Sequence, residues 1–208
     1  MKNKTVIYKQ CIVALCVAIN IIGSFVAMGL RLPIYLDSIG TIFVSSVFGT
    51  GYGVITGILS NLINGISFDI YSLYYIPVQI VTAVMAGYVA KKGWNRNWRS
   101  FAGAMVISVP ASFAGALITA VVFGGITSSG SSYFVAIMHN MGMNLTLSCF
   151  IVQVFTDYFD KLVTVLIVQT ILKRGVAGKG YGTLQQDHKQ KSKGDRSFES
   201  KTMRMGKM

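Results

Sequence analysis

The stretch that decides the fold runs from Ser38 to Ile66 and reads SIGTIFVSSVFGTGYGVITGILSNLINGI. It has no charged residue, and it could form one long tilted helix or two short ones. Glycines at positions 49, 51 and 53 favour a break, because glycine is a poor helix former and tolerates the backbone angles of a tight turn. We therefore predict two short helices, at about 38–49 and 52–66.

The composition around this stretch is that of a membrane protein. The chain has 208 residues, of which 52% are hydrophobic and 12% are charged, against about 25% charged residues in a typical soluble domain. Its apolar blocks approach the roughly 20 residues that a helix needs to cross a bilayer. We predict an all-α membrane protein, a helical bundle whose other spanning segments are about 10–29, 71–90, 100–123 and 155–173.

The basic residues indicate how many times the chain crosses the membrane. They cluster in the first nine residues, in the segment 91–99, and in the tail, where ten Lys and Arg follow Leu172. Lys and Arg that flank spanning helices prefer the cytoplasm. Two crossings within 38–66 put all three clusters on one side, whereas one crossing separates them. We predict a six-transmembrane-helix bundle with cytoplasmic N- and C-termini, multi-pass in the cell (plasma) membrane.

The same pattern predicts two parts of the chain. Residues 1–175 form the six-helix transmembrane domain. Residues 176–208 form a basic cytoplasmic tail whose low apolar content predicts disorder and whose charge attracts it to anionic lipid in the bilayer. The net charge of +12 is then explained by topology, and nucleic acid is not an expected partner.

Polar side chains at the outer ends of the helices are the candidates for a binding site, because such residues usually face a bundle interior or a water-filled cavity. The four acids before the tail, Asp37, Asp69, Asp157 and Asp160, all fall on the outer side in this topology. Tyr35 and Asp37 lie in the first connection. Asp37, or Ser38 after it, could instead cap the next helix.

Two further groups lie on single helix faces. Asn61 and Asn64 are three residues apart, a spacing that also suits hydrogen bonds between helices. Tyr71, Tyr75 and Gln79 are spaced by four along one predicted helix, with Tyr74 alongside. A tyrosine belt at the membrane interface is the alternative for the tyrosines, while Gln79 lies deeper.

The last two groups come from the C-terminal third. His139, Asn140 and Asn144 lie in the segment between the last two predicted helices, and the two asparagines align if that segment is helical. One other histidine, at 188, is too little for a metal site. Asp157 and Lys161 are spaced to pair as i, i+4 residues, which leaves Asp160 as the freer candidate.

Sequence motifs give no support for catalysis. The chain lacks a Gly-x-Ser-x-Gly turn, a His-Glu-x-x-His helix and a phosphate loop that ends in Gly-Lys-Ser/Thr. We therefore expect no enzyme activity and no cofactor.

Three stretches resemble a known family, the substrate-binding (S) components of energy-coupling factor (ECF) transporters. ALCVA carries Ala14 and Ala18, which match the family's Ala-x-x-x-Ala motif. LPIYLDSIGTIFVSSVFGTGYGVITGILSNLI resembles the same region in a subgroup of the family, and YFDKLVTVLIVQTILK resembles its last helix. The resemblance covers about residues 5–175.

The resemblance implies a prokaryotic uptake protein. Such components bind a small water-soluble, vitamin-like molecule near the outer surface, in a pocket formed by the loop after helix one and by helices four to six. They dock through helix one, here Ala14 and Ala18, onto a transmembrane coupling protein driven by two ATPase subunits, which supply ATP hydrolysis. The expected substrate-binding residues are Tyr35, Asp37, Asn61, Asn64, Tyr74, Tyr75, Gln79, His139, Asn140, Asn144 and Asp160.

Other interpretations stay open. A membrane sensor or signalling subunit would use the basic tail to contact a partner. A self-sufficient secondary transporter would be expected to show inverted repeats, and none is visible. The outer acids suit a neutral or cationic solute better than a strongly anionic one, although Arg31, His139 and Lys161 leave the charge of the solute open.

Overall fold

The computed structural model describes residues 2–94, 98–125 and 130–174, and every regular element within them is a helix. Residues 1–169 form one compact unit, to which the description below refers. The predicted tail, 176–208, lies outside the described residues. The helices are α1 (Lys2–Gly29), α2 (Ile39–Phe48), α3 (Thr50–Ser67), α4 (Tyr71–Tyr74), α5 (Ile76–Lys91), α6 (Arg99–Phe123), α7 (Ser131–Asn140) and α8 (Leu145–Arg174).

The predicted break in the deciding stretch is confirmed, and it lies at a single residue. Gly49 has φ +95°, a left-handed conformation that favours glycine, and it separates α2 from α3. The other two glycines lie inside α3. Gly53 has a packing role, because a Cβ there would overlap Ser45 on α2. The helix that was expected from 52 therefore begins at Thr50.

Two other predicted boundaries were wrong. The segment 71–90 is divided at Tyr75 into the short α4 and the longer α5, and Pro77 lies in the first turn of α5. Proline is tolerated there because the first N–H groups of a helix have no partner within it. The last helix begins at Leu145 instead of 155, and α7 precedes it.

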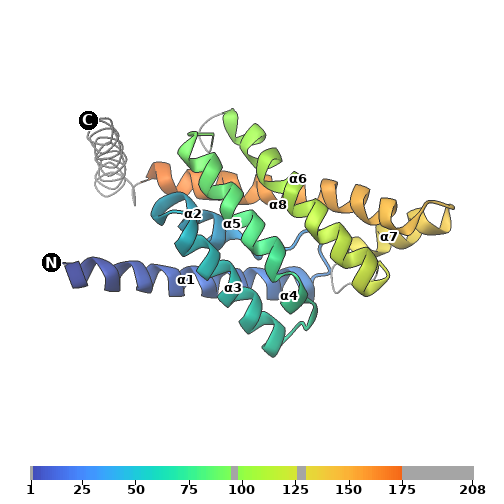
Figure 1. Cartoon of the computed structure of the whole chain (residues 1–208), viewed down its shortest axis with the longest axis horizontal. Coiled ribbons are helices and arrows are strands. Elements are labelled where there is room, and N and C mark those ends of the chain that lie inside the picture. The colour runs from blue at the N-terminus through green and yellow to red at the C-terminus, as the bar shows by residue number, and fades with distance from the viewer. Residues whose placement is uncertain (1, 95–97, 126–129, 175–208) are drawn as a thin grey trace, which may run out of the picture. The chain divides into compact units, whose positions relative to one another are not determined.

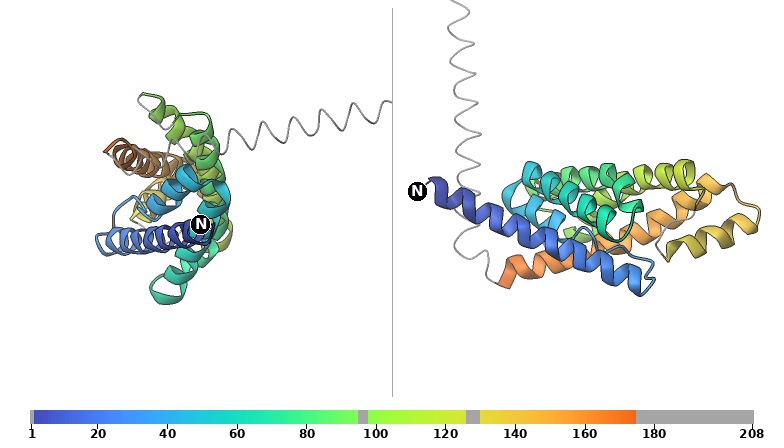
Figure 2. Two further views of the ribbon diagram at one scale, coloured as in Figure 1. Left: turned by 90° about the vertical axis from the view of Figure 1, so that its left-hand side faces the viewer. Right: turned by 90° about the horizontal axis from the view of Figure 1, so that it is seen from below.

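The helices are arranged around a layer formed by α3, α5 and α6 (Figures 1 and 2). α3, α5 and α6 lie side by side, and α2 packs against α1, α3 and α5. Figure 2 shows α1 and α8 on one side of the layer formed by α3, α5 and α6. On the α8 side, Ala116, Val135, Cys149 and Val152 join α6, α7 and α8 in a small apolar cluster.

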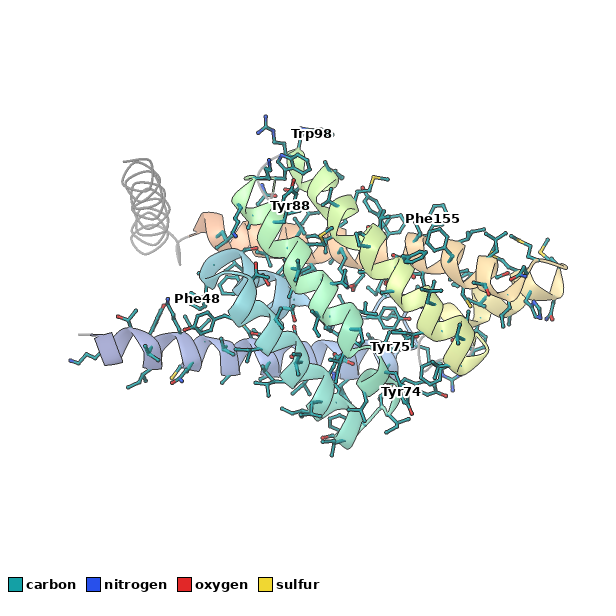
Figure 3. The ribbon with its side chains drawn as sticks, viewed as in Figure 1. Phe48, Tyr74, Tyr75, Tyr88, Trp98 and Phe155 are labelled. Carbon is teal, nitrogen blue, oxygen red and sulfur yellow. The ribbon has the colours of Figure 1, made fainter. Side chains whose placement is uncertain are left out.

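Within the described residues, much of the interior is polar and much of the surface is apolar. Leu15, Phe113 and Val121 are exposed to 61%, 58% and 78%. Phe155 and Trp98 also point outward (Figure 3). Such a surface is costly in water but suits hydrocarbon. Two described helices, over Lys4–Gly29 and Arg99–Phe123, are long and apolar enough to cross a membrane.

A buried asparagine ties the first three helices together. The Asn20 amide nitrogen on α1 donates to Thr41 Oγ1 at 2.9 Å and to Ser60 Oγ at 3.0 Å. Its carbonyl oxygen accepts from the backbone N–H of Gly40 at 2.6 Å. Gly40 lets α1 and α2 approach this closely, because a Cβ there would overlap the carbonyl oxygen of Cys16. This Asn20 cluster satisfies its polar groups within the protein.

Candidate functional site

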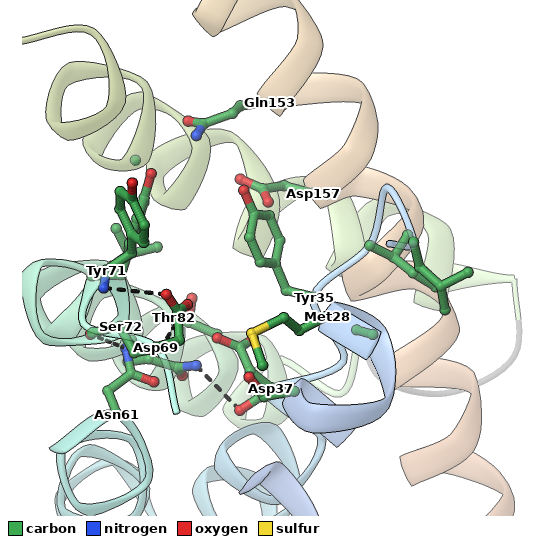
Figure 4. A pocket seen from close by; sticks show the side chains of 18 of the residues that line it. Met28, Tyr35, Asp37, Asn61, Asp69, Tyr71, Ser72, Thr82, Gln153 and Asp157 are labelled. Atoms are coloured by element: carbon green, nitrogen blue, oxygen red, sulfur yellow. Dashed lines mark hydrogen bonds between the residues drawn. The ribbon is translucent and has the colours of Figure 1, made fainter. Parts of the chain in front are cut away.

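A polar cavity lies where the connection between α1 and α2 meets α3, α5, α6 and α8 (Figure 4). Aromatic, amide and carboxylate side chains from the connection, α3, α5 and α8 converge on it, and α6 contributes Gly115. Its lining consists of Ser24, Ala27, Met28, Leu32, Ile34, Tyr35, Asp37, Asn61, Asp69, Tyr71, Ser72, Tyr75, Val78, Gln79, Thr82, Gly115, Gln153, Asp157 and Lys161.

The connection 30–38 is fastened to α8 by a buried pair of neighbouring charges. Asp160 accepts a hydrogen bond from the backbone N–H of Leu36 at 2.8 Å, and Lys161 donates to Ser38 Oγ at 2.9 Å. The two charges also form an ion pair of 2.7 Å, with side chains no more than 5% exposed. Leu36 has φ 50°, an unusual value for a residue other than glycine. The surrounding bonds hold this conformation.

The ion pair corrects the prediction for this segment. Lys161 was expected to pair with Asp157, four positions earlier, and Asp160 was expected to be the freer acid. Asp160 is instead fully buried among donors from the connection. A buried carboxylate requires partners, which here include the lysine. Asp157 lines the cavity in its place.

The capping alternative for Asp37 and Ser38 is not supported. Ser38 occupies the N-cap position of α2, but its side chain makes no capping hydrogen bond; it bonds to the charged pair on α8. Asp37 is half-buried at the cavity wall. Burial raises the pKa of the Asp37 carboxyl, an effect that the Lys161 ammonium opposes.

Two glutamines face the cavity, and each donates one amide hydrogen bond within the protein. Gln79 Nε2 on α5 donates to the backbone carbonyl of Asp37 at 3.2 Å. Gln153 Nε2 on α8 donates to Thr119 Oγ1 at 2.7 Å. Both residues are 3% exposed, and neither carbonyl oxygen has a partner in the described part of the chain. Gly115 makes room for the second, because a Cβ there would lie 2.9 Å from Gln153 Oε1.

Aromatic rings form another part of the wall. The Tyr35 and Tyr75 rings are 6.5 Å apart between centroids and inclined at 40°. The Tyr75 hydroxyl is hydrogen-bonded to Thr119 Oγ1, and its ring stacks on Phe123 at 6.3 Å. Tyr74 also packs on Phe123, edge-on at 5.1 Å, but it is half exposed and does not line the cavity.

The structure brings five of the eleven expected substrate-binding residues to the cavity: Tyr35, Asp37, Asn61, Tyr75 and Gln79. Asn61 also donates to the carbonyl of Ser72 at 3.1 Å, which holds α4 against α3. Of the expected residues away from the lining, Asn64 is buried near the end of α3, where its backbone carbonyl accepts from Phe68 and Asp69.

The group around His139 lies apart from the cavity. α7 ends at Asn140 and α8 begins at Leu145, so Asn140 and Asn144 do not align on one helix as predicted. All three polar residues of the group are exposed. Asn144 Oδ1 accepts from the backbone N–H of Thr146 at 2.9 Å, so this side chain caps α8.

Sequence reasoning missed several lining residues whose spacing could have identified them. Thr82 follows Gln79 by three positions, and Gln153 precedes Asp157 by four, so each pair shares one helix face. Gln153 was overlooked because the last helix was expected to begin after it. Ser24 and Ser72 were also missed, whereas Asp69 and Tyr71 were named in the candidate groups but left out of the expected substrate-binding set.

One predicted contact with a partner lies on a different surface. Ala14 and Ala18 are both exposed on α1, one helical turn apart. Leu15 between them is exposed as well. This face of α1 is therefore not covered by the described part of the chain.

Comparison with known proteins identifies a family for this chain. A family model described as the substrate-specific component of ECF transporters matches residues 10–178. Neither the curated proteins nor the solved structures give a significant match. The matched range includes every residue that lines the cavity. The resemblance inferred from the sequence is confirmed, and the chain belongs to the family of ECF transporter substrate-specific components.

Proposed function

We propose that this protein captures a small water-soluble, vitamin-like molecule outside the cell and delivers it inward through a coupling protein driven by two ATPases. The observation that carries this proposal is a polar, aromatic-lined cavity inside a helical unit whose surface is apolar. Members of this family are substrate-binding subunits, so the ATPase partners supply the energy. Tyr35, Asp37, Asn61, Tyr75 and Gln79 contact the solute, together with Gln153 and Asp157.

The proposed topology has six crossings, made by α1, α2, α3, α4 with α5, α6, and α8. Both termini lie in the cytoplasm of a prokaryotic cell, which puts the cavity toward the outer surface. Support comes from the break at Gly49, which provides the second crossing in 38–66, and from the basic clusters.

The connection 30–38 is the proposed gate of this cavity. It contributes Leu32, Ile34, Tyr35 and Asp37 to the lining. Arg31 Nη1 donates to the Tyr133 hydroxyl at 2.7 Å, which ties the start of the connection to α7. Movement of this segment would open the wall of the cavity without displacing a spanning helix.

Ala14 and Ala18 form the proposed contact with the coupling protein. Small residues one turn apart allow close helix packing in a membrane, and both are exposed on α1.

Co-purification tests the proposed function. The tagged protein should recover a transmembrane coupling protein and two ATPases, and gentle purification should retain a small molecule that mass spectrometry identifies. Ala14→Trp with Ala18→Trp should abolish recovery of the partners and leave the small molecule bound. Ala102→Trp, at an exposed position on α6, is the matched control and should retain the partners. Solute flux in liposomes by the protein alone would contradict the proposal.

A further inference from the structure

We propose, building on the proposed function, that the solute is an organic cation that carries N–H donors on a planar group. Charge, hydrogen-bonding capacity and ring geometry at the cavity each support this class of solute, and they come from different residues.

The ionisable groups at the cavity leave an excess of negative charge. Asp37, Asp69 and Asp157 line the wall, and Lys161 is the basic residue among the lining residues. The Lys161 ammonium is already held by Asp160 at 2.7 Å and by Ser38 at 2.9 Å. When these groups and Asp160 are ionised, four carboxylates and one ammonium leave a net charge of −3. A cation supplies the missing opposite charge, whereas an anion increases the repulsion.

The neutral polar groups of the cavity favour a solute that donates hydrogen bonds. The carbonyl oxygens of Gln79 and Gln153 lack partners in the described part of the chain, although both side chains are 97% buried. Each amide nitrogen already donates one hydrogen bond, that of Gln79 to Asp37 and that of Gln153 to Thr119, so the carbonyl oxygens are the unpartnered groups that these glutamines offer to a solute. Buried acceptors without donors are costly. A solute with two or more N–H groups satisfies them.

The rings determine the expected shape of the solute. Tyr35 and Tyr75 offer faces inclined at 40°, and Figure 4 shows the hydroxyl end of Tyr35 directed toward Asp157. A cation over a tyrosine face gains a further attraction. A planar amidinium, guanidinium or protonated heterocycle can therefore contact a ring with its face and the acceptors with its edge.

Three probes of nearly equal size and shape test this inference: benzamidinium, benzamide and benzoate. Binding to the purified full chain is measured by thermal stabilisation at millimolar concentrations, the range expected for ligands this small. Benzamidinium should bind at least about tenfold more tightly than benzamide, and benzoate should give no stabilisation. Equal or tighter binding of benzamide or benzoate, or no stabilisation by benzamidinium, would overturn the inference.

Variants of the cavity carboxylates test whether the preference for benzamidinium arises in the cavity. Asp157→Asn should reduce the advantage of benzamidinium over benzamide about tenfold. Asp157→Glu should restore the advantage. Asp37→Asn is the independent variant if the first does not fold. If benzamidinium keeps its full advantage over benzamide in every folded variant, the cation binds outside this cavity and the assignment of the preference to the cavity is wrong.

The two proposals can fail separately. Co-purification with the coupling subunits reports on the proposed function and does not depend on solute charge. If the partners are recovered and the solute retained on gentle purification is an anion, the transport function stands and the cation inference is wrong. If the partners are absent but benzamidinium is preferred, the cavity assignment stands and the coupling does not.

Discussion

The carboxylate of Asp160 accepts a hydrogen bond from the backbone N–H of Leu36 at 2.8 Å, across 124 positions of the chain. The same carboxylate holds Lys161, which donates to Ser38. Two adjacent residues of α8 thus fix the segment that forms one wall of the cavity. The proposed gate has a defined position because buried charges hold it.

Removing one partner of the buried pair should be strongly destabilising. Asp160→Ala leaves Lys161 buried without its ion-pair partner and should cost about 3 kcal/mol. It should lower the midpoint of thermal unfolding in detergent. Asp160→Ala combined with Lys161→Met removes both charges and should recover most of that loss. If the double variant is less stable than the single variant, the buried charge is not the cause.

The close contact between α1 and α2 should not accommodate an added methyl group at position 40. In Gly40→Ala the new Cβ overlaps the backbone carbonyl of Cys16, which cannot rotate away. Overpacking of this kind should cost about 1–3 kcal/mol. Gly51→Ala is the matched control, because nothing lies within 4 Å of its Cβ and it is helical. That variant should be neutral or stabilised in the same unfolding measurement.

The Asn20 cluster should contribute to stability without contributing to binding. Asn20→Leu leaves the backbone N–H of Gly40 and two hydroxyls without their partner, which should cost about 2 kcal/mol. Solute affinity of the folded fraction should be unchanged, since none of these residues lines the cavity. Thermal unfolding and equilibrium binding measured on the same preparation separate the two effects.

Gln79 should affect affinity more than stability. Gln79→Leu removes a cavity acceptor and the bond to the carbonyl of Asp37, so affinity for the solute identified by mass spectrometry should fall about tenfold. Gln169→Leu removes another buried glutamine, one that accepts from Ser100 at 3.0 Å away from the lining. Equal loss of affinity in both variants would contradict a direct role of Gln79.

Local backbone chemistry could be predicted from the sequence, and long-range pairing could not. The break in 38–66 follows from the conformational freedom of glycine, and it occurs at Gly49. The division at Tyr75 was missed because regular four-residue spacing of polar side chains suggested one helix. The sequence also contained the signal of Pro77, which favours a helix start as well as a bend.

The charged residues show most clearly what could not be predicted from the sequence. Spacing along one helix favoured Asp157 with Lys161, but the structure pairs Lys161 with Asp160, because a distant segment brings an N–H and a hydroxyl to that carboxylate. No pattern within a single helix contains this information. Five of the nineteen lining residues were nevertheless among the expected substrate-binding residues, because a tyrosine, an aspartate or an amide in an apolar context indicates a polar interior.

The polar interior is divided between two sets of residues with different tasks. The Asn20 cluster satisfies its own hydrogen bonds, whereas the cavity leaves acceptors open, and the two sets share no side chain. Substitutions that alter solute preference can therefore accumulate without eroding the contacts that join the first three helices. This separation makes the chain a suitable scaffold for directed evolution toward new ligands.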